Sequence, residues 1–198
     1  MKAVKGLVSF IALALVGASA QACPVTDSFN QSVAQSVAVA IASERSGMSD
    51  WKVGDRANYN MTIVQFGMKG TMAKYVAKDE GASLWVNSDV SIMGQAQKAQ
   101  MQISKADGKV LKLIVNGKEQ TPPSNDGMEI ISQEASKITV PAGTFDCVHI
   151  VAKSSDAPKI EAWINPRDTV MEGTLKQVVT TQQYGDMALE LLNFTRAQ

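Results

Sequence analysis

Apolar and polar residues alternate along most of the chain after residue 51, and this alternation predicts β-strands. In the stretch QKAQMQISK, Ala99, Met101 and Ile103 take every second position among polar residues. Side chains two positions apart lie on one face of a strand, so this pattern is typical of a strand with one buried and one solvated face. Residues 82–92 alternate in the same way. Further strands are predicted at 58–66, 71–78, 129–140, 144–153, 159–164, 174–182 and 187–195.

Turn residues separate these strands at short intervals. Asp107-Gly108 and Asn116-Gly117 tolerate the positive φ of tight hairpins, so consecutive hairpins are predicted over residues 98–120. The connections are too short for the crossovers that parallel pairing requires. We therefore predict a mainly β (α+β) fold, with one curved antiparallel sheet of about nine strands over residues 51–198.

A single helix is predicted ahead of the strands, at residues 27–45 within an N-terminal helical segment over 23–50. Its apolar positions recur every four residues. They are Phe29, Val33, Val37 and Ile41. The opposite face carries almost no lysine or arginine, unlike a helix that lies on a membrane surface. We expect this helix to pack against the protein's own sheet.

The first 22 residues have the composition of an export signal. Lys2 and Lys5 precede an apolar run over residues 7–16, and small residues follow. The run is shorter than the roughly 20 apolar residues that span a bilayer, and no later stretch is long enough. The sequence therefore predicts a periplasmic or secreted protein.

Two processing products are consistent with this signal. Small residues at Ala18, Ala20 and Ala22 fit a simple cut, whereas Ala22-Cys23 fits a lipoprotein junction. A lipidation site resembling the bacterial lipobox carries a large aliphatic residue three positions before the cysteine, where this chain has Ala20. We favour the simple cut. In the alternative, lipidation of Cys23 anchors the protein in the cell envelope and is its sole link to a membrane.

Charge excludes nucleic acid as a partner. The precursor has 19 basic and 19 acidic residues, and removal of Lys2 and Lys5 leaves 17 against 19, a net charge of −2. Binding to a phosphate backbone depends on clustered lysine and arginine, and the chain has no basic run.

The stretch VPAGTFDCVHIVAK, residues 140–153, contains the only histidine and one of two cysteines. Cys147 and His149 share a strand face about 7 Å apart, whereas a Cys-His nucleophile pair needs roughly 2.6–3.2 Å. A structural zinc site needs four ligands, and no C-x-x-C pair is present. We therefore predict no enzyme activity, metal or cofactor. Cys147 is either a free buried thiol or, in an oxidising compartment, the disulfide partner of Cys23, a pairing that lipidation of Cys23 excludes.

Methionine is abundant for a chain with few aromatic residues. Its flexible thioether lets a methionine-lined face accept apolar ligands of variable shape, although filling of an ordinary core is the competing interpretation. Met61, Met101 and Trp163 are the candidate apolar ligand face. The carboxylate pairs Asp79-Glu80 and Glu129-Glu134 are interpreted as solvated surface groups.

Three stretches resemble a known group of proteins. They are WKVGDRANYNM (51–61), VPAGTFDCVHI (140–150) and KIEAWINPRDTVMEGTLKQ (159–177). They are similar to exported bacterial β-rich envelope proteins of unassigned function. Their arrangement also resembles the incomplete β-barrels of the LolA and LppX-like lipoprotein and lipid carriers, in which a curved antiparallel sheet wraps helical segments over an apolar cavity. The resemblance covers most of residues 51–196, but its motifs mark strands and turns, so it transfers no ligand-binding residue.

These observations lead to one expected function and two alternatives. We expect an exported, noncatalytic cell-envelope protein that binds or carries an apolar or lipid-like ligand. The first alternative is a noncatalytic envelope scaffold or lipoprotein that binds another protein. The remote alternative is an enzyme that depends on a cysteine.

Overall fold

The computed structural model describes residues 50–122, 128–154, 157–182 and 184–198. The predicted signal peptide (1–22) and helix (27–45) lie outside the described residues. Inside them, strands make up most of the chain, and a 3-10 turn, η2 (Val64–Phe66), lies between the first two strands. None of the described residues belongs to a helix of the length and apolarity that membrane crossing requires.

Eleven strands are present, two more than the sequence predicted, and one of the two, the three-residue β6, is too short to leave a periodic pattern. They are β1 (Arg56–Ile63), β2 (Met68–Asp79), β3 (Ser83–Ile92), β4 (Gln95–Ser104), β5 (Val110–Val115), β6 (Lys118–Gln120), β7 (Glu129–Val140), β8 (Gly143–Lys153), β9 (Lys159–Ile164), β10 (Thr174–Thr181) and β11 (Gly185–Thr195).

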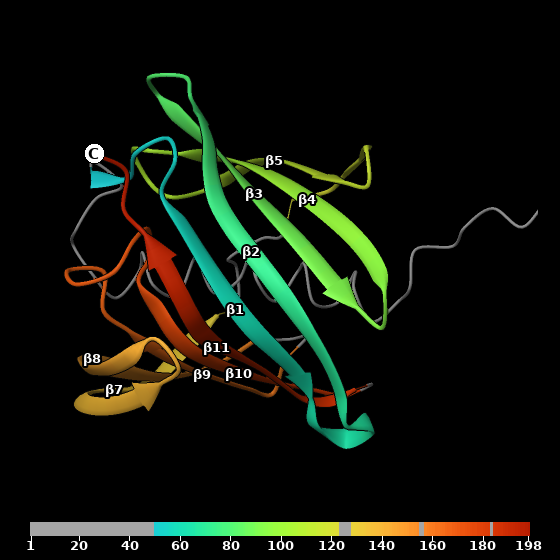
Figure 1. The fold of residues 1–198 in the computed structure, drawn as a ribbon, viewed down its shortest axis with the longest axis vertical. Helices are drawn as coiled ribbons and strands as arrows, with labels where there is room; N and C mark the ends of the chain where they lie inside the picture. The colour runs from blue at the N-terminus through green and yellow to red at the C-terminus, as the bar shows by residue number, and fades with distance from the viewer. Residues whose placement is uncertain (1–49, 123–127, 155–156, 183) are drawn as a thin grey trace, which may run out of the picture.

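The strands form one antiparallel, open sheet in the order β6-β5-β4-β3-β2-β1-β11-β10-β9-β8-β7. It consists of two meanders, β1 to β6 and β7 to β11, and the pairing of β1 with β11 joins them (Figure 1). The predicted antiparallel sheet is thus confirmed within the described residues.

Chain length requires the sheet to curve. β6 and β7 lie at its opposite edges, although β6 ends at Gln120 and β7 begins at Glu129. Ten strand spacings of a flat sheet measure about 48 Å, whereas nine extended residues reach at most about 32 Å. The two edges must therefore approach each other, and Figure 1 shows the sheet bending between β1 and β9.

Alternation along each strand divides the sheet into two faces. In β1, Tyr59, Met61 and Ile63 are buried, while Asn60 is exposed and Thr62 partly exposed. Because antiparallel partners share a face, this set continues into the buried residues of the neighbouring strands. The predicted buried positions of residues 82–104 follow the same rule, with Leu84, Val86, Met101 and Ile103 almost fully buried.

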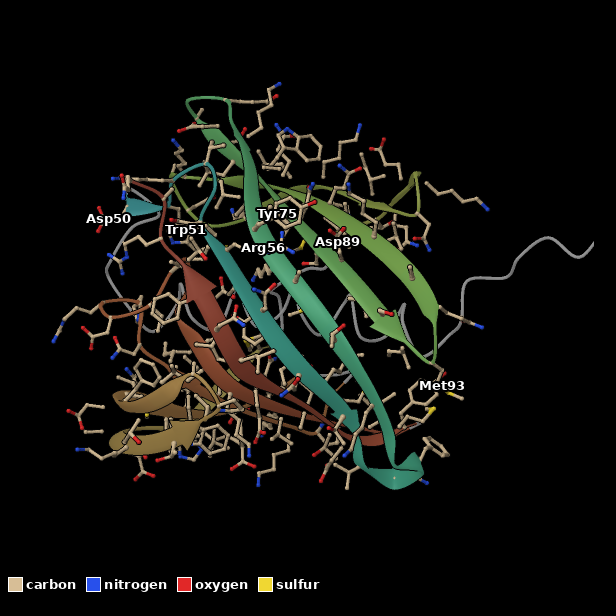
Figure 2. The ribbon with its side chains drawn as sticks, in the orientation of Figure 1. Asp50, Trp51, Arg56, Tyr75, Asp89 and Met93 are labelled. Carbon is tan, nitrogen blue, oxygen red and sulfur yellow. The ribbon has the colours of Figure 1, made fainter. Side chains whose placement is uncertain are left out.

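Two hairpins show why particular residues form the turns. Asn116 and Gly117 have φ values of 51° and 79°, the positive pair that the Asn-Gly dipeptide predicts. Met93 and Gly94 adopt φ values of 51° and 78° between β3 and β4, although methionine gives no such turn signal. This turn places Met93 on the surface, at one end of the β3–β4 hairpin (Figure 2).

The tip of the β7–β8 hairpin is hydrogen-bonded to β11 beside a β-bulge. Asn58 pairs with Asn193 and Tyr59 with Leu191, so Leu192 is the extra residue. The Ala142 N–H at the hairpin tip donates to the Leu191 carbonyl, with an N···O distance of 3.1 Å. The hairpin is therefore held against β11 as well as β9.

Candidate functional site

The larger candidate site is the buried apolar side of six adjacent strands, β11 and β1 to β5, which we call the apolar face. Direct partners carry it across the sheet: Met61 lies opposite Leu189, and Met101 lies between Val86 and Leu113. Its apolar members are Ala57, Tyr59, Met61, Ile63, Met72, Val76, Leu84, Val86, Val90, Ile92, Ala99, Met101, Ile103, Leu113, Val115, Met187, Leu189 and Leu191.

Two of the three residues predicted for an apolar ligand face lie here. Met61 and Met101 are both on the apolar face, each 1% exposed. Trp163 lies on the opposite side of the sheet, because its neighbour Ala162 shares the side of Met61 through the pairing chain Ala162–Gln177–Leu189–Met61. The structure therefore brings the two methionines to one face, whereas Trp163 lies on the other side of its strand and packs, partly buried, against the same hydrophobic cluster.

Trp163 instead stacks on His149, its direct partner on β8. The ring centroids are 4.3 Å apart and the planes differ by 10°. The His149 Nδ1 lies 3.4 Å from a Glu134 carboxylate oxygen, and its Nε2 lies 3.5 Å from Glu161 without hydrogen-bonding to it. This histidine thus sits between an aromatic ring and two carboxylates.

Cys147 has different neighbours from His149. Its thiol is partly buried and forms no disulfide within the described residues, and burial raises its pKa. Asp146 also raises this pKa by repulsion, while a hydrogen bond with Ser136 acts in the opposite direction. A raised pKa keeps the thiol protonated at neutral pH, which disfavours a nucleophilic thiolate. Its predicted partner Cys23 lies outside the described residues, so the disulfide and the lipidation stay predictions.

Three of the four carboxylates singled out in the sequence, Asp79, Glu80 and Glu129, have lysine partners, whereas Glu134 contacts His149. Asp79 is 2.7 Å from the Lys105 ammonium, and Glu80 is 2.6 Å from that of Lys78. Hydrogen bonds from these lysines are the main reason that the pKa of each carboxyl is lowered. Neither group is therefore suited to donate a proton at neutral pH. Across the described residues, His, Cys, Asp and Glu form no group of three that could hold a metal ion.

A buried ion pair interrupts the apolar face. Lys74 on β2 lies between Ala57 and Ser88 in the cross-strand register, and its ammonium is 2.5 Å from the Glu172 carboxylate. The side chains are 1% and 2% exposed. Burial, with repulsion from Glu172, raises the pKa of Tyr59 well above its usual value. Glu172 belongs to the connection between β9 and β10, which we call the 165–173 loop.

Local hydrogen bonds fix the 165–173 loop over the sheet. The Asn165 side-chain amide donates to the Asp146 carbonyl and the Asp168 carboxylate, and the Asn165 backbone N–H donates to the Gly173 carbonyl. Gly173 has a φ of +74°, and a Cβ there would lie 2.2 Å from the Pro166 nitrogen. Only glycine fits this close approach without a shift of the backbone. The resulting loop conformation places the neighbouring Glu172 next to Lys74.

Other buried polar atoms on the same face lack protein partners. Ser88 Oγ, Gln97 Oε1, Gln177 Nε2 and Glu172 Oε2 make no hydrogen bond within the described part of the chain. The strand register places Ser88 and Gln97 on the apolar face, and Gln177 on the same side of the adjacent strand β10. Buried polar groups are nearly always hydrogen-bonded. These four atoms can therefore still form hydrogen bonds that the described residues do not supply.

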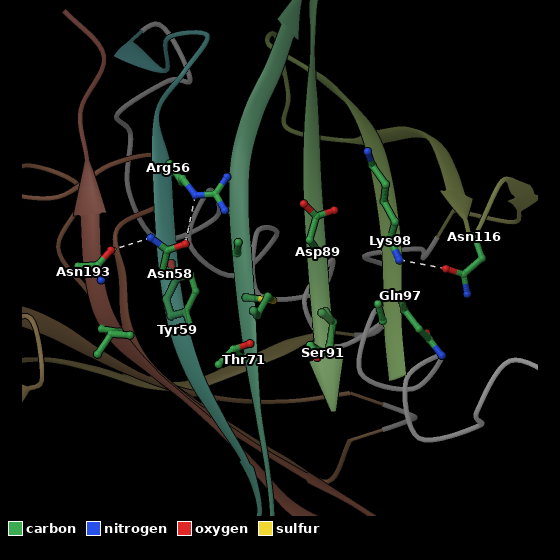
Figure 3. A pocket seen from close by; sticks show the side chains of 15 residues that line it. Arg56, Asn58, Tyr59, Thr71, Asp89, Ser91, Gln97, Lys98, Asn116 and Asn193 are labelled. Carbon is green, nitrogen blue, oxygen red and sulfur yellow. Dashed lines mark hydrogen bonds between the residues drawn. The ribbon is translucent and has the colours of Figure 1, made fainter. Parts of the chain in front are cut away.

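The opposite side of the same strands carries a shallow depression of about 630 Å³, which we call the polar groove (Figure 3). One in-register row crosses it from β11 to the start of the β5–β6 turn. The row is Asn193, Asn58, Ala73, Asp89, Lys98 and Asn116. The groove was not predictable from the sequence, because its residues come from six separate segments that only the strand pairing brings together.

No protein-family profile matches the chain, and no curated protein matches it in sequence. Several solved structures are similar. They include a chain of the MucA/MucB complex of Pseudomonas aeruginosa (10% identity, 82% of this chain and 56% of that chain, TM-score 0.46). They also include hypothetical protein CT021 of Chlamydia trachomatis (11%, 73% and 88%, TM-score 0.48) and an outer membrane lipoprotein-sorting protein domain of Vibrio parahaemolyticus (11%, 84% and 93%, TM-score 0.32).

The chain spans little more than half of the matched MucA/MucB chain. The resemblance expected from the sequence, to β-rich envelope proteins and lipoprotein-sorting domains, is confirmed as a likeness in the arrangement of the chain. At these identities the likeness concerns the fold alone.

Proposed function

We propose that this protein is a noncatalytic, exported protein of the cell envelope that binds an apolar or lipid-like molecule on the apolar face. The observation that carries this proposal is the continuous set of apolar side chains across six adjacent strands of an open sheet. Four methionines lie within it: Met61, Met72, Met101 and Met187. Their flexible side chains allow such a face to fit apolar molecules of different shapes.

The unpartnered polar atoms favour a lipid-like ligand over a plain hydrocarbon. Ser88 Oγ and Gln177 Nε2 are buried among apolar side chains and have no hydrogen-bond partner among the described residues. A ligand with ester, amide or hydroxyl groups would hydrogen-bond to them and remove the cost of leaving them unpaired, about 1–3 kcal/mol each. Export is proposed from the signal at residues 1–22, with lipid anchoring through Cys23 as the alternative.

Strand β7 supports a second candidate, a scaffold that binds another protein. β7 is an edge strand, and its residues 129–135 are exposed on both faces. Ile130 and Ile131 are 40% and 56% exposed. An exposed edge with apolar side chains is suited to accept a strand from a partner protein.

A matched pair of methionine variants tests the ligand-binding proposal. We expect Met101→Gln to weaken binding of the fluorescent fatty acid cis-parinaric acid about tenfold, because it places an amide in the apolar face. Met93→Gln makes the same chemical change at a side chain that is 76% exposed, and should leave the affinity unchanged. Fluorescence titration measures both, with circular dichroism to verify folding. Equal affinities for folded Met101→Gln and wild type would exclude the apolar face as the site.

A further inference from the structure

The polar groove lies on the side of the sheet away from the apolar face, so any ligand it binds is separate from the proposed apolar one. Its floor is made of small side chains, Thr71, Ala73, Ser91 and Ala96, on three adjacent strands. Five neighbouring strands and the start of the β5–β6 turn carry its central row, whose six positions correspond to a length of about 24 Å. The groove therefore has the extent of a chain-like ligand.

Hydrogen bonds hold one end of the groove in a fixed arrangement. The Arg56 guanidinium lies over the Tyr75 ring, 5.1 Å from its centroid, and its Nε donates to Asn58 Oδ1 at 3.2 Å. Asn58 Nδ2 donates in turn to Asn193 Oδ1 at 2.6 Å. Figure 3 shows the two hydrogen bonds, from Arg56 to Asn58 and from Asn58 to Asn193. These contacts orient the outer N–H groups of Arg56 and the amide N–H groups of Asn193, and they leave those groups able to donate hydrogen bonds to a ligand.

Charged groups in the middle of the groove are also unused. Asp89 and Lys98 are direct cross-strand partners, yet among the described residues neither makes an ion pair. By contrast, Lys112 on β5 forms a 2.9 Å ion pair with Glu119 on β6. At the far end, Asn116 Oδ1 accepts from the Lys98 backbone N–H at 3.0 Å, which leaves its amide N–H groups for a ligand.

This set of groups selects for one ligand chemistry. The strands that line the groove pair with neighbours on both sides, so they offer no free backbone edge to a peptide. Tyr59, Met72 and Val90 also line the groove, but they are at most 2% exposed, so Leu192 is the one large apolar side chain of the lining that a protein partner could contact, too little for a hot spot. Arg56, Lys98 and Asp89 together carry a charge of +1, which is too weak for a polyanion.

Hydroxyl groups both donate and accept hydrogen bonds, so a ligand rich in hydroxyls can satisfy amides, a carboxylate and two cations in one row. We propose that the polar groove is a binding site for a neutral carbohydrate chain. Asn58, Asp89, Lys98, Asn116 and Asn193 supply the hydrogen bonds to its hydroxyls. The small floor residues allow the sugar rings to approach the sheet.

Titration of the full mature chain with maltopentaose, cellopentaose and chitopentaose tests this proposal, with NMR of the asparagine side-chain amides as the readout. We expect at least one sugar to shift the signals of Asn58, Asn116 and Asn193. Asp89→Ala and Asn193→Ala should each weaken that binding about five- to tenfold. Asn60→Ala is the matched control, since Asn60 is an exposed asparagine on the same side of β1 outside the groove. It should change affinity by less than about twofold.

A blocking variant separates the groove from other sites. Ser91→Trp fills the floor at an exposed strand position, where an aromatic residue is tolerated. It should abolish sugar binding and leave cis-parinaric acid binding intact. The proposal is overturned if none of the sugars shifts the groove signals, or if sugar binding survives in Ser91→Trp. It is equally overturned if a polar pentapeptide shifts these signals and the sugars do not, which would indicate a protein-docking surface.

Discussion

Replacement of Lys74 by methionine is expected to destabilise the protein by about 3–5 kcal/mol, because it leaves a buried carboxylate without its counter-charge. Glu172 is 2% exposed, and its other contact is a 3.3 Å hydrogen bond from Thr174 to the same oxygen that meets Lys74. Glu172→Leu alone should lower the stability by a similar amount, since it leaves the buried Lys74 ammonium without a counter-charge. Urea unfolding at neutral pH measures both losses.

The double variant distinguishes a lost attraction from a stranded charge. Lys74→Met with Glu172→Leu places two apolar side chains of similar size where the ions were, so we expect stability within about 1 kcal/mol of wild type, or higher. The partly exposed pair of Lys176 and Glu190, 2.7 Å apart, is the control, and Lys176→Met should cost at most about 1 kcal/mol. Single variants at Lys74 and Glu172 that cost no more than this control would contradict the buried ion pair.

Gly173→Ala is expected to destabilise the protein by about 3 kcal/mol, from two sources. A left-handed φ of +74° costs a residue with a Cβ about 1 kcal/mol. The added Cβ would also lie 2.2 Å from the Pro166 nitrogen, so the 165–173 loop must shift, at a further cost of about 1–3 kcal/mol. Thermal and urea unfolding measure the sum.

Gly81 provides the control for the clash. Its φ is +79°, and nothing lies within 4 Å of an added Cβ. Gly81→Ala should therefore show only the backbone cost of about 1 kcal/mol. If the two alanine variants lose the same stability, the close approach of Gly173 to Pro166 does not constrain the loop. A larger loss at Gly173 would mean that this glycine positions Glu172.

Local pattern was sufficient to predict the antiparallel sheet, because burial of one face imposes a period of two on each strand. Residues 95–104 alternate in burial much as their sequence alternates. The Asn116-Gly117 turn was predictable for a similar reason, since its conformation depends on two adjacent residues. The pairing of β1 with β11 was not predictable in this way, because it joins residues more than a hundred positions apart and leaves no local mark.

The candidate site was only partly predictable. Lys74 lies on the buried side of β2, between Met72 and Val76, which marks it as an unusual lysine. Nothing in the local sequence identifies its partner, which is 98 residues away. The position of Trp163 depends on the register between β9 and β10, which shifts between Thr174 and Lys176. Such a bulge changes the face that following residues occupy, and alternation within one strand cannot reveal it.

The central claim, that the apolar face binds an apolar or lipid-like molecule, is tested most directly by native mass spectrometry of the full exported protein after gentle purification. Lipid extraction of the same sample identifies any bound molecule, and the denatured mass separates it from a covalent lipid on Cys23. We predict a noncovalent adduct that is lost on denaturation and recovered in the lipid extract. A native mass equal to the denatured mass, together with no binding of cis-parinaric acid, would contradict the claim.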